Sequence, residues 1–207
     1  TRRSSDYCAA VLESHAARGF VRSVRHKPRA NASPRDVSPG GMTDQRWRAG
    51  FGRLAGLGLR FDLQTPWWHL GEAATLAADY PDTPIILNHT GLPADRSPEG
   101  LAGWRAAMAE LALRPNVSVK ISGLGQPGRA WTVDANRGII RTVIDLFGVD
   151  RCMFASNFPV DSLCGSFADI FGGFEASVAD LAEPEREALF AGNARRIYGI
   201  GGSNGEA

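Results

Sequence analysis

Polar side chains stand at the ends of apolar runs, and their types suit the hydrolysis of an ester-like bond. His89 comes just after the run Ile85–Leu87, and Asn157 comes just after Cys152–Ala155. A histidine held at a strand end can polarise a carbonyl, hold a metal ion or move a proton. Asn157 can hold a water molecule or a carbonyl by hydrogen bonds. Asp161 is the candidate base, provided that its side chain points inward.

A second set of polar residues could bind the oxygens of a substrate, because cationic and amide groups at strand ends can hold a carboxylate. The candidates are Arg25, His26, Lys27, Gln64 and Lys120. Structural alternatives stay open for three of them. His26 could be a solvated loop group, and Gln64 could satisfy a loop backbone. Lys120 could form an interior ion pair with Asp62.

Two common hydrolase signatures lack support in the sequence. HExxH does not occur, and the one GxSxG match, GGSNG (201–205), lies in the expected tail and not at a turn between a strand and a helix. A serine hydrolase therefore has no support, because its nucleophile needs that sharp turn. One GxGxxG match, GLGQPG (123–128), stands at the end of the strand expected at 116–125, but the next expected helix begins only at 135. A dinucleotide-binding loop opens directly into a helix, so a nucleotide-binding sheet is disfavoured. We assign no residue to a metal site.

Strands that alternate with helices must position these residues. We expect five strands, at 21–28, 59–64, 84–91, 116–125 and 152–158. The expected helices are 4–17, 43–58, 69–80, 97–114, 135–148, 166–181 and 184–198. Thr43 and Ser97 are the expected N-caps of two helices, and Pro98 suits a first helical position. This order predicts βαβ units with a parallel sheet.

The strand patterns favour a barrel over an open sheet. Strands buried on both faces are near-continuous apolar runs. In LRFDLQ (59–64), apolar residues instead alternate with Arg60, Asp62 and Gln64, and VSVKIS (117–122) alternates in the same way. A polar face near the strand ends is typical of a (β/α)₈ barrel, in which the carboxyl ends of the strands converge on one site.

Composition indicates an ordinary globular chain and excludes several classes of partner. The 207 residues carry a net charge of +1, with 43% hydrophobic residues. This balance gives no indication of nucleic acid or membrane as a partner. The three cysteines, Cys8, Cys152 and Cys164, lack metal-like spacing, which predicts a reduced, cytoplasmic protein. We expect one domain over residues 1–200 and a flexible tail over 201–207.

Four motifs, in order, resemble the amidohydrolase-related family. They are PDTPIILNHTGLP (81–93), NVSVKISGL (116–124), FGVDRCMFASNFPVD (147–161) and LFAGNARRIY (189–198). The resemblance runs from about residue 18 to residue 200 and points to the branch with 2-pyrone-4,6-dicarboxylate lactonase-like and L-fuconolactonase-like enzymes. It implies a distorted (β/α)₈ barrel and mostly hydrolytic reactions, with decarboxylases in related branches.

Two departures from the family pattern qualify this expectation. The pattern begins with a His-x-His strand, whereas the four histidines here are His15, His26, His69 and His89. The chain is therefore expected to be an incomplete TIM-like barrel of about five βα units, lacking its first three. The family's final Asp is replaced by Asn157, and an amide is a poorer cation ligand than a carboxylate. Zinc or manganese is expected, if at all, only in the intact protein.

The resemblance thus predicts a hydrolase that acts on a lactone or related cyclic ester of a small carboxylated or sugar-acid substrate. His89, Asn157 and Asp161 would be its catalytic residues. One alternative is a truncated, catalytically inactive barrel fragment that acts at most as a partner-binding or oligomer-forming protein. Another is a decarboxylase of the same superfamily, which would require a divalent metal.

Overall fold

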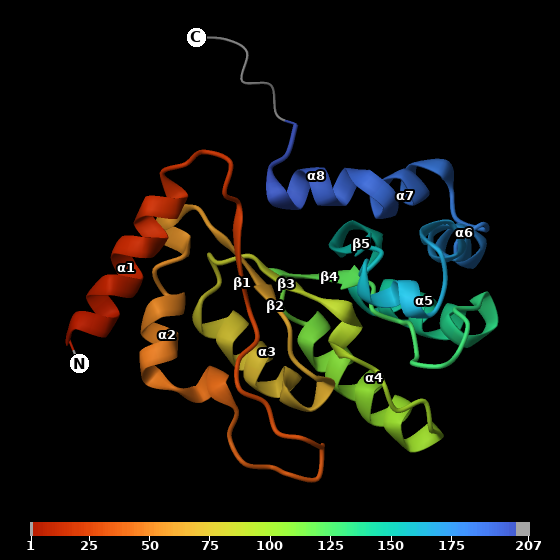
Figure 1. Ribbon diagram of the computed structural model, residues 1–207, viewed down its shortest axis with the longest axis horizontal. Helices are drawn as coiled ribbons and strands as arrows, with labels where there is room; N and C mark the ends of the chain where they lie inside the picture. Colours follow the sequence, from red (N-terminus) through yellow and green to blue (C-terminus); the bar gives the residue numbers. More distant parts are fainter. Residues whose placement is uncertain (1, 202–207) are drawn as a thin grey trace. The chain divides into compact units, whose positions relative to one another are not determined.

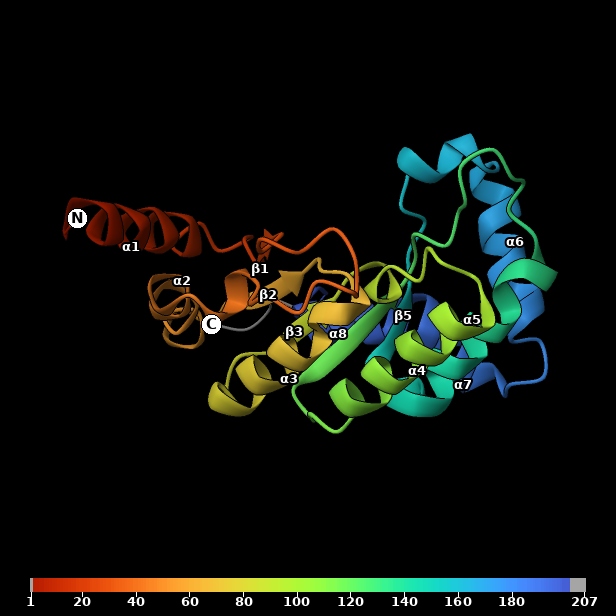
Figure 2. The same cartoon turned by 90° about the horizontal axis from the view of Figure 1, so that it is seen from below.

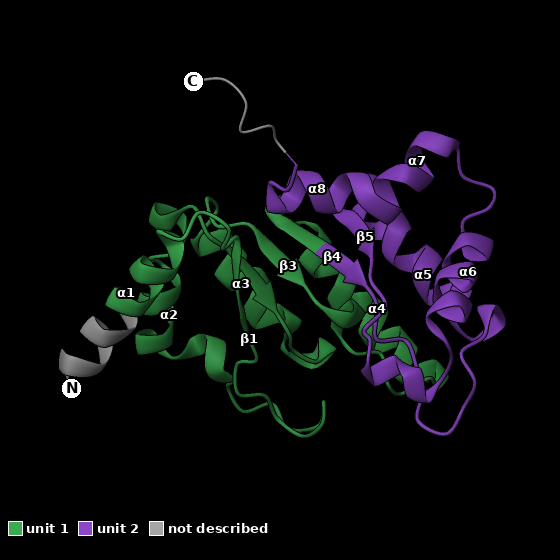
Figure 3. Ribbon diagram, turned by 45° about the horizontal axis from the view of Figure 1, so that its top comes forward, with its two compact units in different colours: residues 1–118 green, residues 119–207 purple. Residues whose placement is uncertain are grey.

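The computed structural model describes the backbone of residues 2–201 and the side chains from Ala9 onward. Cys8 and nearly all of the expected tail, 202–207, lie outside these described parts. The chain divides into two compact units, residues 1–118 and 119–207 (Figure 3). The expectation of a single domain over 1–200 stays a prediction. No helix of the described residues is long and apolar enough to cross a membrane.

Five short parallel strands follow one another in chain order in the sheet. They are β1 (Ser23–His26), β2 (Arg60–Leu63), β3 (Ile85–Leu87), β4 (Val117–Ile121) and β5 (Cys152–Phe154). Each lies inside its predicted range and is shorter. In the first unit Arg25 lies opposite Asp62, and in the second Lys120 lies opposite Met153. The predicted alternation is confirmed in β4, where Val117, Val119 and Ile121 are buried.

The helices of the first unit are α1 (Arg2–Ala16), α2 (Gln45–Phe51), α3 (Leu70–Asp79) and α4 (Pro98–Ala112). In Figures 1 and 2, α1 lies beside α2, and α3 lies beside α4. The predicted start of α4 is confirmed, because the Ser97 hydroxyl accepts a hydrogen bond of 3.0 Å from the Gly100 N–H.

The prediction of one helix over 43–58 with Thr43 as its N-cap is wrong. Asp44 is the N-cap of α2, since its carboxylate accepts from the N–H groups of Arg46 and Trp47. A carboxylate also interacts favourably with the positive end of a helix dipole. The helix ends at Phe51, in a stretch whose several glycines have low helix propensity. A short 3₁₀ turn follows, which Gly58 closes at φ 64°.

Four aromatic rings pack together in the first unit. Trp47 stacks on Phe51 at 5.5 Å between ring centroids. Phe51 also meets Phe61 at 5.0 Å and Tyr80 at 5.1 Å, edge to face. These contacts attach α2 to β2 and to the residue that ends α3.

The helices of the second unit are α5 (Val133–Phe147), α6 (Phe167–Ser177), α7 (Glu183–Glu187) and α8 (Asn193–Tyr198). A π-helical turn, Ala188–Gly192, joins the last two, which therefore follow one another in a row (Figure 1). Phe154 of β5 stacks on Phe174 of α6 at 4.4 Å. Asn193, part of the LFAGNARRIY motif, donates its amide hydrogens to the carbonyls of Val149 and Cys152, both at 2.8 Å.

Cys152 lies at the start of β5 and is fully buried, with its Sγ 3.8 Å from the Val143 carbonyl oxygen. Burial raises the pKa of its thiol to about 12. Cys152 therefore behaves as a small apolar core residue. Cys164 is also a buried free thiol.

Candidate functional site

Three of the predicted site residues meet in the first unit. They come from the carboxyl ends of β1, β2 and β3 and form the Arg25 cluster, defined as Arg25, Gln64 and His89. One guanidinium nitrogen of Arg25 donates to Gln64 Oε1 at 2.6 Å and lies 3.0 Å from His89 Nε2. A guanidinium can only donate, so this second contact is a hydrogen bond when Nε2 carries no proton. His89 then holds its proton on Nδ1.

The backbone around His89 fixes the position of its ring. His89, Thr90 and Leu92 have φ values of 56°, 52° and 57°. The left-handed region is unfavourable for most side chains and is tolerated best by glycine, Asn, Asp and His. The predicted strand therefore ends early, at Leu87. The indole N–H of Trp104 donates to the Thr90 carbonyl at 2.8 Å and supports this turn. His89 is buried.

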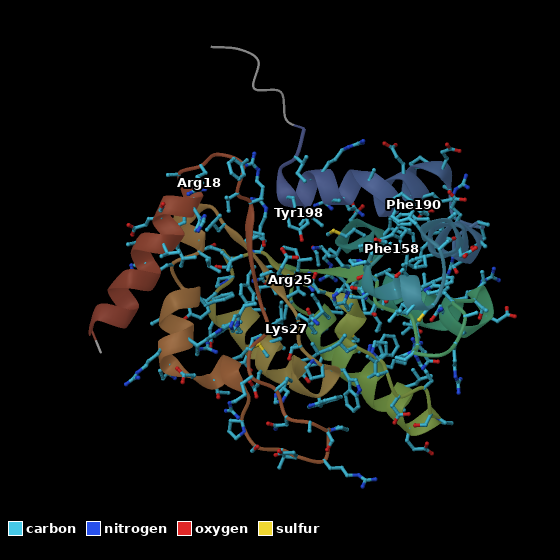
Figure 4. The ribbon with its side chains drawn as sticks, viewed as in Figure 1. Arg18, Arg25, Lys27, Phe158, Phe190 and Tyr198 are labelled. Atoms are coloured by element: carbon cyan, nitrogen blue, oxygen red, sulfur yellow. The ribbon has the colours of Figure 1, made fainter. Side chains whose placement is uncertain are left out.

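His26 and Lys27 do not join the Arg25 cluster. Consecutive strand residues point to opposite faces, which separates His26 from Arg25. His26 Nδ1 instead accepts a hydrogen bond of 3.2 Å from the indole N–H of Trp47. Lys27 is exposed just beyond the end of β1, on the same segment as Arg25 (Figure 4). Substrate-binding roles for His26 and Lys27 stay predictions.

Asp62 is a buried carboxylate that the sequence placed on the same strand face as Gln64. Its Oδ2 accepts a hydrogen bond of 2.5 Å from the Ser23 hydroxyl. The register of β1 and β2 explains the contact, because Ser23 lies opposite Arg60, two residues before Asp62. Sequence reasoning missed this pair, although both residues lie on the polar faces of their strands. An ion pair between Asp62 and Lys120 stays a prediction.

Asn157 and Asp161 meet in the second unit, in the loop after β5. Asn157 has φ 57°, and its side-chain amide donates to Asp161 Oδ1 at 2.8 Å. The Gly125 N–H lies 3.4 Å from Asp161 Oδ2. Asp161 is buried, and its role as the base stays a prediction. Burial raises the pKa of the Asp161 carboxyl, and the hydrogen bonds from Asn157 and Gly125 offset part of that effect.

Gly125 makes room for the Asp161 carboxylate. A Cβ at this position would lie 3.1 Å from Asp161 Cγ and 2.9 Å from Cys164 Sγ. Both distances are too short for an unstrained contact. The absence of a side chain at Gly125 therefore lets its N–H approach the carboxylate.

Asn157→Asp tests whether the amide is needed beside Asp161. The variant replaces a donor 2.8 Å from Asp161 Oδ1 with a second carboxylate, and neighbouring like charges raise the pKa of the pair further. Raised pKa values in the folded state retain stability at low pH and lose it as pH rises. We expect a loss on the order of 1 kcal/mol near neutral pH and little loss near pH 4, from thermal melts across that range. Asn157→Gly is the matched control, because it keeps the left-handed backbone without adding charge. An equal loss at every pH would contradict the prediction.

Lys120 is held by an aromatic ring within the second unit. Its Nζ lies 5.0 Å from the centroid of the Tyr198 ring, at the end of α8 (Figure 4 labels Tyr198). A cation over a ring face is attracted by the ring quadrupole. The sequence placed Tyr198 in the last family-like motif but gave no signal of this contact, which depends on the path of α8.

Residues 2–200 match a protein-family model described as Amidohydrolase. An uncharacterized protein of Sinorhizobium fredii, y4mH, is 47% identical over 154 residues, which are 74% of this chain and 52% of that protein. An L-fucono-1,5-lactonase of Burkholderia ambifaria is 33% identical over 154 residues, which are 72% of this chain and 52% of the lactonase. The chain thus spans about half the length of the curated relatives it matches.

Solved structures share the fold. A crystal structure of an amidohydrolase from Burkholderia multivorans with bound HEPES superimposes with a TM-score of 0.74 and 29% identity, covering 86% of this chain and 64% of that one. Another structure of an amidohydrolase from this organism, at 28% identity and the same TM-score and coverage, contains bound zinc. These likenesses confirm the predicted fold class, an incomplete (β/α)₈ barrel with five βα units.

The donor groups of the described residues do not fit a divalent metal ion. Among the side chains that the structure describes, from Ala9 to residue 201, no three of His, Cys, Asp or Glu gather in a group that could hold one. His89 Nε2 faces the permanently charged guanidinium of Arg25 at 3.0 Å, which would repel a cation. Asn157 offers an amide where the resemblance led us to expect a carboxylate.

Proposed function

The chain belongs to the amidohydrolase family, and on this basis we propose that it hydrolyses a lactone or related cyclic ester of a small carboxylated or sugar-acid substrate. The family resemblance predicted from the sequence, in the lactonase-like branch, is confirmed. L-fucono-1,5-lactonases of two Burkholderia species, at 35% and 33% identity, support the choice of a lactone.

The observation that carries the proposal is the Arg25 cluster at the carboxyl ends of three neighbouring strands. The guanidinium can bind a substrate carboxylate through two parallel hydrogen bonds. When Arg25 turns to the substrate, His89 Nε2 loses its donor and becomes able to accept a proton. His89 Nδ1–H is then the donor available to the scissile carbonyl oxygen. Arg25 would thus bind the substrate carboxylate and release the His89 ring, whose Nδ1–H orients the carbonyl.

Asn157 and Asp161 supply the groups that water activation requires. Asp161 would take a proton from water, whose oxygen adds to the lactone carbonyl carbon. The ring C–O bond then breaks, and the proton held by Asp161 passes to the departing ring oxygen. Water and lactone are consumed and one hydroxy acid is formed. Asn157 would hold the water through its amide, while Lys120 would bind an oxygen of the substrate.

A hydrolysis screen tests the proposal. The 207-residue chain, and any longer product of the same reading frame that begins upstream, are assayed with L-fucono-1,5-lactone, 2-pyrone-4,6-dicarboxylate and simple δ-lactones, with and without chelator. We expect acid release from at least one lactone. A longer product that folds and hydrolyses none of them would contradict the proposal and favour the inactive-fragment alternative. Chelator-sensitive release of CO₂ from an aromatic carboxylate would favour the decarboxylase instead.

A further inference from the structure

A buried histidine that takes no part in the proposed chemistry holds the loop after β1, residues 27–40. The side chain of His69, at the start of α3, is 4% exposed. Its Nε2 accepts a hydrogen bond of 2.9 Å from the Asn31 N–H, and its Nδ1 lies 3.0 Å from Glu72 Oε1. A backbone N–H can only donate, so Nε2 carries no proton and Nδ1 donates to the Glu72 carboxylate. The ring thus offers one acceptor to the loop and one donor to the first turn of α3.

Two further hydrogen bonds attach the same loop to the same place. The indole N–H of Trp68 donates to the Asn31 carbonyl at 3.1 Å, so both main-chain groups of Asn31 are held. Glu72 Oε1 also accepts a hydrogen bond of 2.6 Å from the Gly40 N–H, at the other end of the loop. A Cβ at Gly40 would lie 2.7 Å from His69 Nδ1 and 2.8 Å from Glu72 Oε2, so a side chain there would displace both groups. We call Asn31, Gly40, Trp68, His69 and Glu72 the loop clamp.

The loop clamp is joined to the Arg25 cluster by two chain segments. At the cluster, the Gln64 N–H donates to the His26 carbonyl at 3.1 Å, beside the contact of Arg25 with Gln64 Oε1. From there residues 26–31 and residues 64–69 both run to the loop clamp, where hydrogen bonds join them again. Each segment contains a proline, which fixes one backbone dihedral and stiffens the segment. The two segments therefore form a closed ring, with the cluster at one end and the loop clamp at the other.

We propose that His69 is a positioning residue, which keeps the carboxyl end of β1, and with it Arg25, in place against Gln64. The inference rests on the proposed function, in which Arg25 binds the substrate carboxylate. Two parallel hydrogen bonds to a carboxylate require a fixed geometry, so the backbone that carries the guanidinium has to be held. Loss of the His69 ring would leave the Asn31 N–H and the Glu72 carboxylate without their shared partner, which favours local opening. The end of β1 would then detach more often, and substrate binding would weaken.

Amide hydrogen exchange, followed by NMR, tests the inference without any substrate. The Gln64 N–H reports the hydrogen bond to His26 at the end of β1, whereas the Phe61 N–H, bonded to the Pro84 carbonyl, reports the other side of β2. We expect His69→Phe to speed exchange at Gln64 on the order of tenfold and to leave exchange at Phe61 unchanged. His69→Gln should restore protection, because one side-chain amide offers both an acceptor and a donor.

A matched pair of glycine substitutions separates the loop clamp from general stability. Gly40→Ala places a methyl group against the His69 ring, whereas Gly71→Ala, within α3, places one where no atom lies within 4 Å. Gly40→Ala should speed exchange at Gln64 as His69→Phe does, and Gly71→Ala should not. Unchanged exchange at Gln64 in the His69→Phe and Gly40→Ala proteins would overturn the inference. Equal acceleration at Phe61 would also overturn it, by showing a loss of stability throughout the unit.

Kinetics separate failure of the inference from failure of the proposed function. For a lactone that the unmodified protein hydrolyses, we expect His69→Phe and Gly40→Ala to raise KM on the order of tenfold and to leave kcat unchanged. Gly71→Ala should change neither. A fall in kcat at unchanged KM would overturn the inference, by placing His69 in the chemical step. If no lactone is hydrolysed, the proposed function fails, and the exchange rates at Gln64 still decide whether His69 holds the end of β1.

Discussion

His89→Asn is expected to reduce kcat/KM for the lactone by roughly 10²–10⁴-fold, the range for loss of a positioned acid–base group. The variant removes the ring nitrogen that faces Arg25 at 3.0 Å. Asparagine tolerates the φ of 56° at this position, so the fold should lose less than about 1 kcal/mol. Steady-state kinetics and thermal melts of the same preparation make the measurement.

The choice of asparagine over alanine keeps this result interpretable. Alanine in a left-handed conformation costs roughly 1–2 kcal/mol, so His89→Ala would combine lost chemistry with backbone strain. His15→Asn is the matched control, because His15 lies exposed in the last turn of α1. Unchanged kcat/KM in a folded His89→Asn protein would remove His89 from the mechanism. A loss that follows a lowered melting temperature would assign it a structural role.

Asp161→Asn is expected to have a comparable effect, with a distinct dependence on pH. Asp161 must be deprotonated to take a proton from water, so kcat/KM of the unmodified protein should fall as pH falls through its pKa. Burial raises this pKa above that of an ordinary aspartate. The variant should lower kcat/KM by about 10²-fold or more and should lack this acid limb. A full pH–rate profile of both proteins tests the prediction.

The same substitution should also change how the melting temperature of the protein depends on pH. The folded protein favours the neutral form of Asp161, so its contribution to stability is fully present at low pH and is lost as pH rises through the raised pKa. Asp161→Asn should remove that loss, so its melting temperature should decline less than that of the unmodified protein between pH 4 and pH 8. Asp82→Asn, at an exposed position, is the control. A variant that keeps the acid limb would show that another group is the base.

Capping residues predicted a helix boundary correctly where the sequence offered a single candidate. Ser97 followed by Pro98 marks the start of α4, and no neighbour competes with it. At the start of α2, Thr43 and Asp44 are both candidate N-caps. Asp44 is the N-cap because its carboxylate accepts hydrogen bonds from two backbone N–H groups. The end of β3 was predicted too late, because nothing in the apolar pattern signals the left-handed turn at His89.

Part of the candidate site was predictable, because the carboxyl ends of neighbouring parallel strands lie close together. Arg25, Gln64 and His89 were expected at the ends of parallel strands and are in contact. Strict alternation along β1 could have separated His26 from Arg25. The contact of Asn157 with Asp161 depends on a residue in the left-handed conformation and on a 3₁₀ turn. Neither feature is indicated by the amino-acid sequence.

The rate at which Cys152 reacts reports local opening of the second unit. Only a thiolate reacts with an alkylating reagent, and burial both raises the pKa of the Cys152 thiol and keeps reagent away from it. Alkylation of Cys152 therefore requires that β5 separate from α5 and from the Asn193 amide. The thiol then regains its ordinary acidity. The rate of Cys152 labelling thus reports how often β5 detaches from the elements packed around it.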